Sequence, residues 1–463
     1  MDEHQEQEPQ RQIAATAYVG VDVGPSNTKM HGKVVRRDVT TLCPSASFLL
    51  HTNSRSMATA VRCTKPTEDA PLCLEMLQPG ASIEGRNVVT MFMPLLGVAS
   101  IAEVRPPVLA HFQGVGMELF DALPDDGLGD DSLRIRLPDG TLVSSRAVTV
   151  AFVEGMCALI PRLLAERWVN VVPPAVLDVK ITASLPDVPR ETTLLYEDMW
   201  NRAWQAGEPA AVSPVLVTNE DRASIVACLP HVGVDAATPY RNVVTVDLGH
   251  ASCTVNHRTL VYDAATGESI HVPGATHLSD LGSVVVSDAV ADLVRRRVLD
   301  RPGLPDDYFE DADCFINKLT VPYVKDQLKH ALSNALLSGA GEIDFADYNV
   351  WVYRGFTDDL TNTDSWDKMV YDAPINTVFR RDEIQRCFDD ANRPLAAFLR
   401  GSGVGTPDTC TICIGGGLRG AMVSPEVRAV LGNPDPAVFG FERSTTLVAA
   451  GNVGYRVGHA GGV

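Results

Sequence analysis

Two segments with the same pattern constrain the fold of this chain more than any other feature of its sequence. Each is a valine-rich run that ends in Asp-aliphatic-Gly and continues through small polar residues, from Tyr18 to Thr28 and from Val243 to Ser252. A further run that can form a strand follows each segment, at Lys33–Val35 and at Thr254–Tyr262. The pattern predicts, twice, a strand, a tight glycine-containing turn and a return strand.

The residue types in these turns favour a nucleotide site. A carboxylate at a strand end suits a hydrated divalent cation, while the backbone N–H groups of the turn can face phosphate oxygens. Asp22 or Asp247 alone could simply cap a turn, as aspartate often does. Two copies in the same context instead predict two related lobes that hold one nucleotide between them.

Hydrophobic periodicity and turn residues predict that helices and strands alternate along the chain. The expected elements are strands at 175–183 and 409–414, a polar helix ending at Trp204, and helices at 147–168, 284–299, 324–337 and 382–399. Pro161 predicts a kink or an early stop in the helix at 147–168. This order of elements implies α/β lobes with mixed sheets.

The charge of the chain argues against a nucleic-acid partner. It has 58 acidic and 39 basic residues, a formal net charge of −19, which repels phosphate backbones. The densest cationic cluster, Arg295–Arg297, falls at the end of an expected helix, where cations complement the helix dipole.

The N-terminus and the cysteines favour a soluble cytoplasmic protein without a membrane segment. Met1–Arg11 is acidic and Gln-rich and lacks the apolar core of a signal peptide, and no run is expected to be long enough to span a bilayer. Ten cysteines without a framework spacing fit a reducing compartment. Cys410 and Cys413 are interpreted as part of a buried strand, the alternative being a redox or metal pair.

Several motifs, taken in order, resemble the ATPase domain of DnaK-type heat-shock proteins, a branch of the actin-like ATPase superfamily. The two Asp-X-Gly turns resemble its phosphate loops, and Val217–Ala223 resembles the segment with its catalytic glutamate. Further likenesses are the Thr276–Ser283 turn, the Lys329–Ser333 helix that clasps adenine and ribose, the Gly415–Arg419 adenosine loop and the last helix at 448–454. The resemblance runs from Ala17 to about Val457, nearly the whole chain.

The resemblance implies an actin-like ATPase fold with two lobes, each with a mixed β-sheet flanked by helices, and a nucleotide cleft between them. A flexible acidic tail at 1–15 would precede lobe I at 16–240, with a small upper subdomain at about 41–145. Lobe II would span 241–463, with a small upper subdomain at about 281–376. The peptide-binding domain that follows in such chaperones is not expected in this chain.

The resemblance also implies ATP or ADP with Mg²⁺ as ligands. Asp22, Glu220 and Asp247 would be catalytic, and Asp22 and Asp247 would hold the metal. The implied nucleotide-binding residues are Gly24, Ser26, Asn27, Thr28, Gly249, Ser252, Asp326, Lys329, His330, Ser333, Gly415, Gly416, Gly417 and Arg419. Taken without the resemblance, Glu220 could be a helix-start charge, the glycine run a plain turn, and Lys329 and Ser333 surface residues.

The second turn departs from the family's pattern. His250 and Ala251 stand where glycine would let the backbone approach phosphate closely. Ser252 keeps a hydroxyl in place of the family's threonine, but Thr254 replaces an aspartate that helps to hold the metal. Asp221 also stands where the family has a proline after its glutamate.

A lysine that the family places near the γ-phosphate has no match at its usual position. No lysine occurs between Lys65 and Lys180, and Arg86 is the nearest substitute, although arginine and lysine differ in reach and geometry. Phosphoryl transfer depends on such groups to neutralise developing charge. We therefore expect nucleotide binding with slow or absent ATP hydrolysis.

The segment 348–376 is longer than the family needs and mixes aromatic with acidic residues. It predicts an elongated hairpin, a partner-binding loop, or both. Two functions stay open: an adenine-nucleotide binder with a degenerate catalytic centre, or a nucleotide-free scaffold that keeps the chaperone ATPase fold. A sugar or acetate kinase is the third and least favoured, because the Lys329–Ser333 match argues against it.

Overall fold

The computed structural model describes residues 15–25, 27–36, 46–47, 56–65, 70–79, 87–122, 128–168, 177–186, 188–207, 213–299, 322–339, 341–344, 378–432 and 447–460. These residues form a mixed α/β structure with two larger sheets, one in each half of the chain. Parallel and antiparallel pairing occur in both larger sheets, so the α/β class predicted from the sequence is confirmed.

The first larger sheet carries the first Asp-X-Gly turn. Its strands are β1 (Ala15–Val23), β2 (Asn27–Arg36), β3 (Ala46–Ser47), β4 (Ser56–Ala58), β11 (Leu177–Leu185) and β12 (Leu216–Asn219). β1 pairs antiparallel with β2, which follows the turn, and parallel with β11. β11 in turn pairs parallel with β12.

The second larger sheet repeats this arrangement around the second turn. Its strands are β13 (Tyr240–Leu248), β14 (Cys253–Asp263), β15 (Glu268–Ser279) and β18 (Thr409–Ile414). β13 pairs antiparallel with β14 and parallel with β18. The two turns also close alike, since the Gly24 N–H donates to the Asn27 carbonyl at 3.1 Å and the Gly249 N–H to the Ser252 carbonyl at 2.9 Å. Both predicted strand–turn–strand segments are confirmed.

Smaller sheets and the remaining helices complete the described structure. The small sheets are β6-β5-β7 (Cys73–Met76, Ala60–Thr64, Val88–Thr90), β10-β9-β8 (Leu142–Ser144, Arg134–Arg136, Glu118–Phe120) and β16-β17 (Glu342–Asp344, Val378–Arg380). The helices are α1 (Pro106–Gly114), α2 (Ser145–Trp168), α3 (Arg190–Gly207), α4 (Glu220–Val232), α5 (Val284–Leu299), α7 (Pro322–Leu337), α10 (Arg381–Gly401), α11 (Leu418–Ala421), α12 (Pro425–Leu431) and α15 (Leu447–Ala460), with short 3₁₀ turns at Met93–Leu95 and Ile101–Glu103.

Most elements expected from periodicity are confirmed to within a few residues, but one expectation about α2 is wrong. The helix contains Pro161 and continues to Trp168, the end expected from its periodicity, so of the two effects expected of Pro161 the early stop does not occur. Contrary to expectation, its stretch Ser145–Glu166 is long and apolar enough, by length and composition, to cross a membrane. Because 61% of that apolar window is buried inside the fold, the apolar residues serve as core, as Phe152 and Ile160, both 0% exposed, illustrate. Cys410 and Cys413 lie in β18 as expected.

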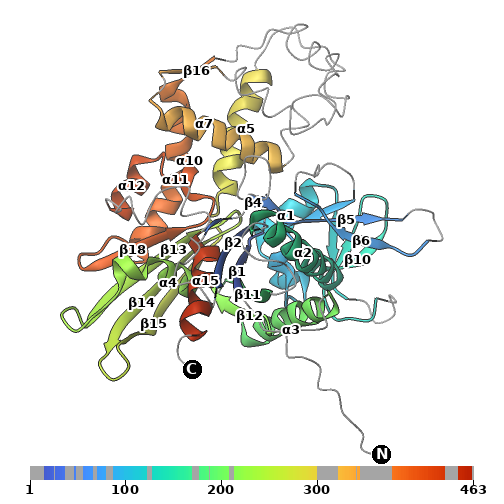
Figure 1. Ribbon diagram of the computed structural model, residues 1–463. Coiled ribbons are helices and arrows are strands. Elements are labelled where there is room, and N and C mark those ends of the chain that lie inside the picture. Colours follow the sequence, from blue (N-terminus) through green and yellow to red (C-terminus); the bar gives the residue numbers. More distant parts are fainter. Residues whose placement is uncertain are drawn as a thin grey trace, which may run out of the picture.

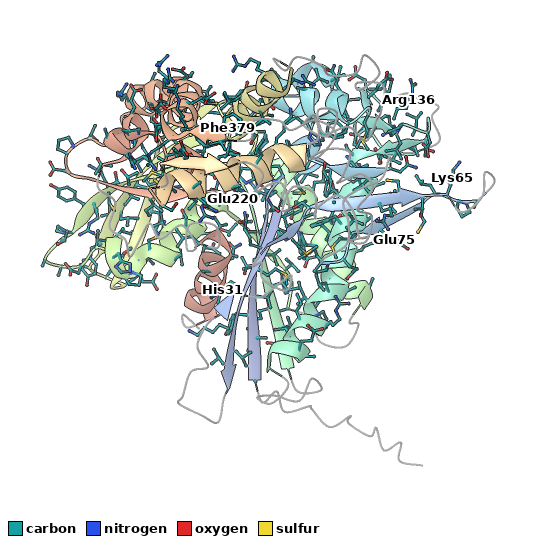
Figure 2. The ribbon with its side chains drawn as sticks, turned by 90° about the horizontal axis from the view of Figure 1, so that it is seen from above. His31, Lys65, Glu75, Arg136, Glu220 and Phe379 are labelled. Atoms are coloured by element: carbon teal, nitrogen blue, oxygen red, sulfur yellow. The ribbon has the colours of Figure 1, made fainter. Side chains whose placement is uncertain are left out.

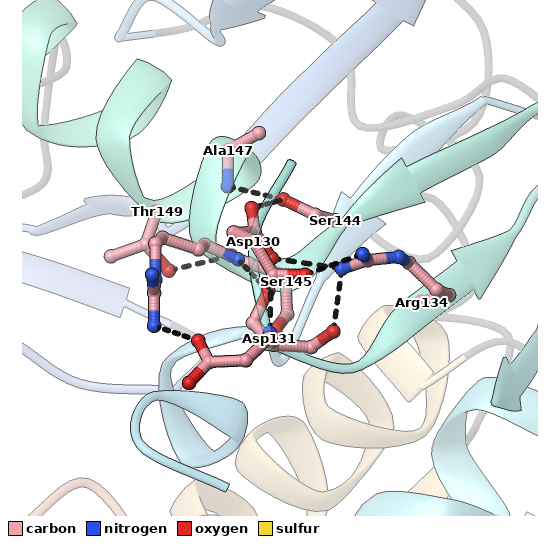
Figure 3. A network of polar contacts seen from close by, with 9 residues as sticks. Asp130, Asp131, Arg134, Ser144, Ser145, Ala147 and Thr149 are labelled. Atoms are coloured by element: carbon pink, nitrogen blue, oxygen red, sulfur yellow. Dashed lines mark hydrogen bonds and ion pairs between the residues drawn. The ribbon is translucent and has the colours of Figure 1, made fainter. Parts of the chain in front are cut away.

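A polar network fixes the start of α2 (Figure 3). The Asp130 carboxylate accepts hydrogen bonds from Ser132, from Arg134 Nη1 at 2.8 Å and from Ser144 Oγ at 2.7 Å. Ser144 Oγ in turn accepts from the Ala147 N–H at 2.9 Å, which caps the helix. Burial disfavours a charge on Asp130, but these hydrogen bonds outweigh it and lower the pKa of its carboxyl.

Helix α15 joins the two halves. Figure 1 shows it between the sheet of β1 and the sheet of β13, next to α4. A Cβ atom on Gly20 of β1 would lie 2.0 Å from the Ala449 carbonyl oxygen, and one on Gly451 would lie 1.7 Å from the Ala223 carbonyl oxygen of α4. Backbone therefore contacts backbone on both sides of the helix, which only glycine permits. Asn452 Nδ2 adds a hydrogen bond to the Val21 carbonyl at 2.9 Å.

We predict that Gly451→Ala lowers the free energy of unfolding by about 3 kcal/mol or more, because the methyl group forces α15 away from α4. Gly401→Ala is the matched control, since nothing lies within 4 Å of its Cβ position at the end of α10. The control should be neutral or up to about 1 kcal/mol more stable. Urea denaturation measures both, and equal stability of the two variants would contradict the packing described.

Candidate functional site

The topology brings three predicted acidic residues together. Asp22 lies at the end of β1, Glu220 is the first residue of α4 directly after β12, and Asp247 lies near the end of β13. The charge of Asp22 acts on both Glu220 and Asp247, and the charge of Asp247 acts on Glu220. We call Asp22, Glu220 and Asp247 the acid cluster. Glu220 lies near the middle of the molecule in Figure 2, whereas Lys65 and Glu75 lie at its far edge.

Lys29 belongs to this site and was not predicted from the sequence. It is the β2 partner of Asp22 across the β1–β2 ladder, and its Nζ lies 3.2 Å from Asp22 Oδ2. Both side chains are largely buried, at 13% and 8% exposure. Burial disfavours the ammonium, but Asp22, Glu220 and Asp247 outweigh it and raise the pKa of Lys29. The offset of seven residues from the strand-end acid, across a tight turn, was the available signal.

Glu220 and Asp247 hold their protons more tightly than ordinary carboxyl groups do. Burial, then Asp247 and Asp22, raise the pKa of Glu220 well above its ordinary range. Burial and the charge of Asp22 raise the pKa of Asp247 to about 6. The two carboxyl groups share a hydrogen bond, which favours the proton on Glu220. A cation bound beside these two groups would stabilise their charged forms.

The predicted glycine run packs against the acid cluster. Gly415 has φ +96°, and a Cβ atom there would lie 2.7 Å from Asp247 Oδ1. The Gly417 N–H donates to the Leu248 carbonyl at 2.9 Å. The Cβ position of Gly416, by contrast, has nothing within 4 Å. The run therefore presents one open backbone position beside the acids, as a close approach to phosphate would require.

The residues of the two turns that are predicted to contact phosphate differ in their contacts. Gly24 and Gly249 lie in the closed turns described above, and Asn27 and Ser252 supply the accepting carbonyls. Thr28 is fully buried, and its hydroxyl is hydrogen-bonded to Thr59 Oγ1 at 2.8 Å. Ser26, Arg86 and the segment 348–376 lie outside the residues that the structure describes, and so does the tail up to residue 14.

The residues predicted to contact the nucleoside form a buried network of their own. Lys329 is 1% exposed, and its Nζ lies 2.8 Å from Asp326 Oδ1 and 3.1 Å from Ser283 Oγ. Ser287 Oγ donates to Asp326 at 2.6 Å, and His250 Nδ1 lies 3.3 Å from Asp326 Oδ2. Burial opposes the charge of Asp326, but Lys329 and His250 hold the pKa of its carboxyl well below its usual range. Lys329 is therefore not a surface residue.

The other predicted nucleoside contacts surround this network. Ser333 is fully buried and donates to the Lys329 carbonyl of its own helix at 2.7 Å. Burial, then the charge of Lys329, lower the pKa of His330 to about 4. Arg419 lies in α11, whose Gly420 is close to the Lys329 side chain. A recess beside Gly417 has a volume of about 10 Å³, room for roughly one water molecule.

Asp221, His250 and Thr254, which differ from the pattern of the heat-shock ATPase domain, take part in structural contacts. Asp221 is 3% exposed and pairs with Arg258 of β14, which links α4 to the second sheet. The His250 carbonyl accepts from the Val284 N–H at 2.9 Å. Thr254 lies directly opposite Asp247 in the β13–β14 ladder, so a neutral hydroxyl faces the acid cluster there.

The chemistry of the acid cluster suits a hard cation, since carboxylate oxygens are the ligands that Mg²⁺ prefers. Within the described part of the chain, however, no group of three or more His, Cys, Asp or Glu side chains is arranged to hold a metal ion. Lys29 lies among the acids instead. The phosphate end of the predicted site therefore fits Mg²⁺ in its donor chemistry, while a lysine already supplies one positive charge.

No protein-family model matches this chain, and no curated protein matches it at a significant level.

We predict that the acid cluster makes the protein less stable as pH rises through about 4 to 6. The ordinary pKa of Asp247 is 3.8 and its folded value is about 6, so the folded state keeps a proton that the unfolded chain has already released. Stability is present below the unfolded value and lost as pH rises through the folded value, by up to about 3 kcal/mol. Asn cannot titrate, so Asp247→Asn should reduce this slope in urea unfolding curves, and the raised pKa of Glu220 should account for what remains. An identical slope in the variant would contradict the protonation described.

We also predict that Lys329→Met lowers the free energy of unfolding by about 3–5 kcal/mol, because it leaves Asp326 buried without its cation. Lys325→Met in the same helix is the control. Its pair with Asp288 is 2.7 Å long, against 2.8 Å for the Lys329 pair, but the side chains are 24% and 49% exposed, so the substitution should cost no more than about 1 kcal/mol. Denaturant unfolding compares them, and similar losses would show that the Lys329 network is not a buried ion pair.

Proposed function

We propose that this protein binds an adenine nucleotide together with Mg²⁺ between its two halves, and that it hydrolyses ATP slowly or not at all. The observation that carries the proposal is the acid cluster, in which two strand ends and one helix start supply one buried and two half-buried carboxyl groups. A divalent cation would stabilise the charged forms of these groups. It would also neutralise phosphate charge.

The repeated architecture supports the finer fold that the sequence suggests. Each larger sheet has an Asp-bearing strand between an antiparallel return strand and a parallel later strand. The turns after these strands close with the same hydrogen bond. We propose that the halves are the two lobes of an actin-like ATPase fold, with the acid cluster in the cleft between them.

Asp22 and Asp247 would hold the metal, and the turns at Gly24 and Gly249 would face the phosphates. Gly416 offers open backbone beside the acids. Slow hydrolysis is expected because Thr254, opposite Asp247, carries no charge. The resembling family has an aspartate at this place that helps to hold the metal, so the site would hold its cation with one carboxylate fewer.

The second candidate is a nucleotide-free scaffold of the same fold. The Lys329–Asp326–His250 network favours it, since Asp326 and Lys329, which are expected to contact the nucleoside, bind each other, and His250 lies beside Asp326. A nucleoside would have to compete with these buried contacts. The acid cluster, at the phosphate end of the predicted site, favours nucleotide binding, whereas the Lys329 network, at the nucleoside end, favours the scaffold. Inorganic pyrophosphate has no nucleoside, so comparing it with ATP separates the two ends.

We predict that Mg²⁺-ATP and Mg²⁺-ADP raise the thermal unfolding midpoint. A ligand at about 100 times its dissociation constant adds roughly 2.7 kcal/mol of stability. The control is Asp22→Asn/Asp247→Asn, which should lose the response because both metal-holding carboxylates are gone. A response to Mg²⁺-pyrophosphate alone would restrict binding to the phosphate end. No response to any of these ligands at millimolar concentration would contradict the proposal and favour the scaffold.

A further inference from the structure

The positive charge of Lys29 lies beside the carboxyl groups of the acid cluster. The β1–β2 ladder sets it opposite Asp22, and the ion pair between them is 3.2 Å long. Its Nζ also lies 3.8 Å from the Cβ position of Gly24, at the turn itself. The ammonium thus lies between the carboxylate of Asp22 and the backbone of the first turn.

Among the residues that the structure describes, Lys29 is the cation that pairs with the acid cluster. The charges of Asp22, Glu220 and Asp247 all act on its ammonium. A divalent cation approaching Asp22 would meet Lys29 at the same carboxylate, where the two positive charges repel each other. A phosphate group that entered with the cation would offer the ammonium a new partner, since lysine binds phosphate as a point charge.

We propose that Lys29 is the resident cation of the acid cluster: it competes with a divalent ion for Asp22, and it passes to phosphate oxygens when the ion enters together with a phosphate ligand. The first part, competition between Lys29 and a divalent ion for Asp22, does not require a nucleotide. The second part, in which the Lys29 ammonium moves to phosphate oxygens, rests on the proposed function. The consequence is that the wild-type site takes up a divalent ion well only with its phosphate ligand, so ion and ligand bind cooperatively.

The test compares wild type, Lys29→Met and Lys180→Met by thermal unfolding and by direct Mn²⁺ titration, each with Mn²⁺ or Mg²⁺ alone and with Mg²⁺-ATP. Lys180 is a matched control, because it lies in β11 of the same sheet and pairs with Asp178 rather than with the acid cluster. We expect Lys29→Met to bind Mn²⁺ alone at least about tenfold more tightly than wild type. Lys180→Met should behave as wild type. Lys29→Met should also gain less stability from Mg²⁺-ATP, because phosphate has lost its lysine.

Each result decides one part of the proposal. Equal Mn²⁺ affinity in Lys29→Met and wild type would overturn the competition. Tighter Mn²⁺ binding with an unchanged Mg²⁺-ATP response would overturn only the passage to phosphate. Tighter Mn²⁺ binding with no Mg²⁺-ATP response in wild type would support the competition and contradict the proposed function.

The Lys29→Met variant leaves the acids without their cation, so its folding is part of the test. Refolding that requires Mn²⁺ would support the proposal, because the ion then replaces the ammonium. Failure to refold even with saturating Mn²⁺ would overturn it, provided that Lys180→Met refolds normally.

Discussion

Close backbone contact on both faces of α15 is the constraint on which the rest of the structure depends. Gly20 lets β1 approach one face of the helix, and Gly451 lets the helix approach α4 on the other. The second sheet packs on α4 and α15 through residues such as Val243 and Ile414. Because this contact draws the two sheets to one helix pair, the strand ends that carry Asp22 and Asp247 meet at one place. The acid cluster is thus a product of packing between halves, not of any local motif.

Two buried charge centres result, and each has an internal lysine. Lys29 pairs with Asp22 beside the acid cluster, and Lys329 pairs with Asp326 in α7. Burying a charge is costly unless a partner lies beside it, so both lysines stabilise the fold as it stands. They also stand at the two ends of the site that the sequence predicts, one at the phosphate end and one at the nucleoside end. Any ligand of this site must therefore offer more than the contacts it displaces, and phosphate charge with Mg²⁺ is the ligand chemistry best able to do so.

The residues that depart from the heat-shock pattern take part in packing. Asp221 pairs with Arg258 between α4 and β14, and His250 lies beside Asp326 while its backbone bonds to the start of α5. Thr254 removes a negative charge from a site that already holds three carboxyl groups. Asp221 and His250 thus tie elements of the centre together, and Thr254 adds no charge to it.

The sequence by itself determined the local elements. Valine-rich runs and glycine turns predicted both strand–turn–strand segments, and helical periodicity predicted α5, α7 and α10 closely, because these signals act between residues near in the chain. Asp22, Glu220, Asp247 and the glycine run could also be named in advance from motif order. Only the tertiary structure decided that the apolar residues of α2 lie in the core, that Lys29 pairs with Asp22, and that Lys329 is buried against Asp326. Those outcomes depend on burial and on contacts between residues far apart in the sequence. The sequence around a charged residue does not identify the charged residue that will lie beside it in the fold.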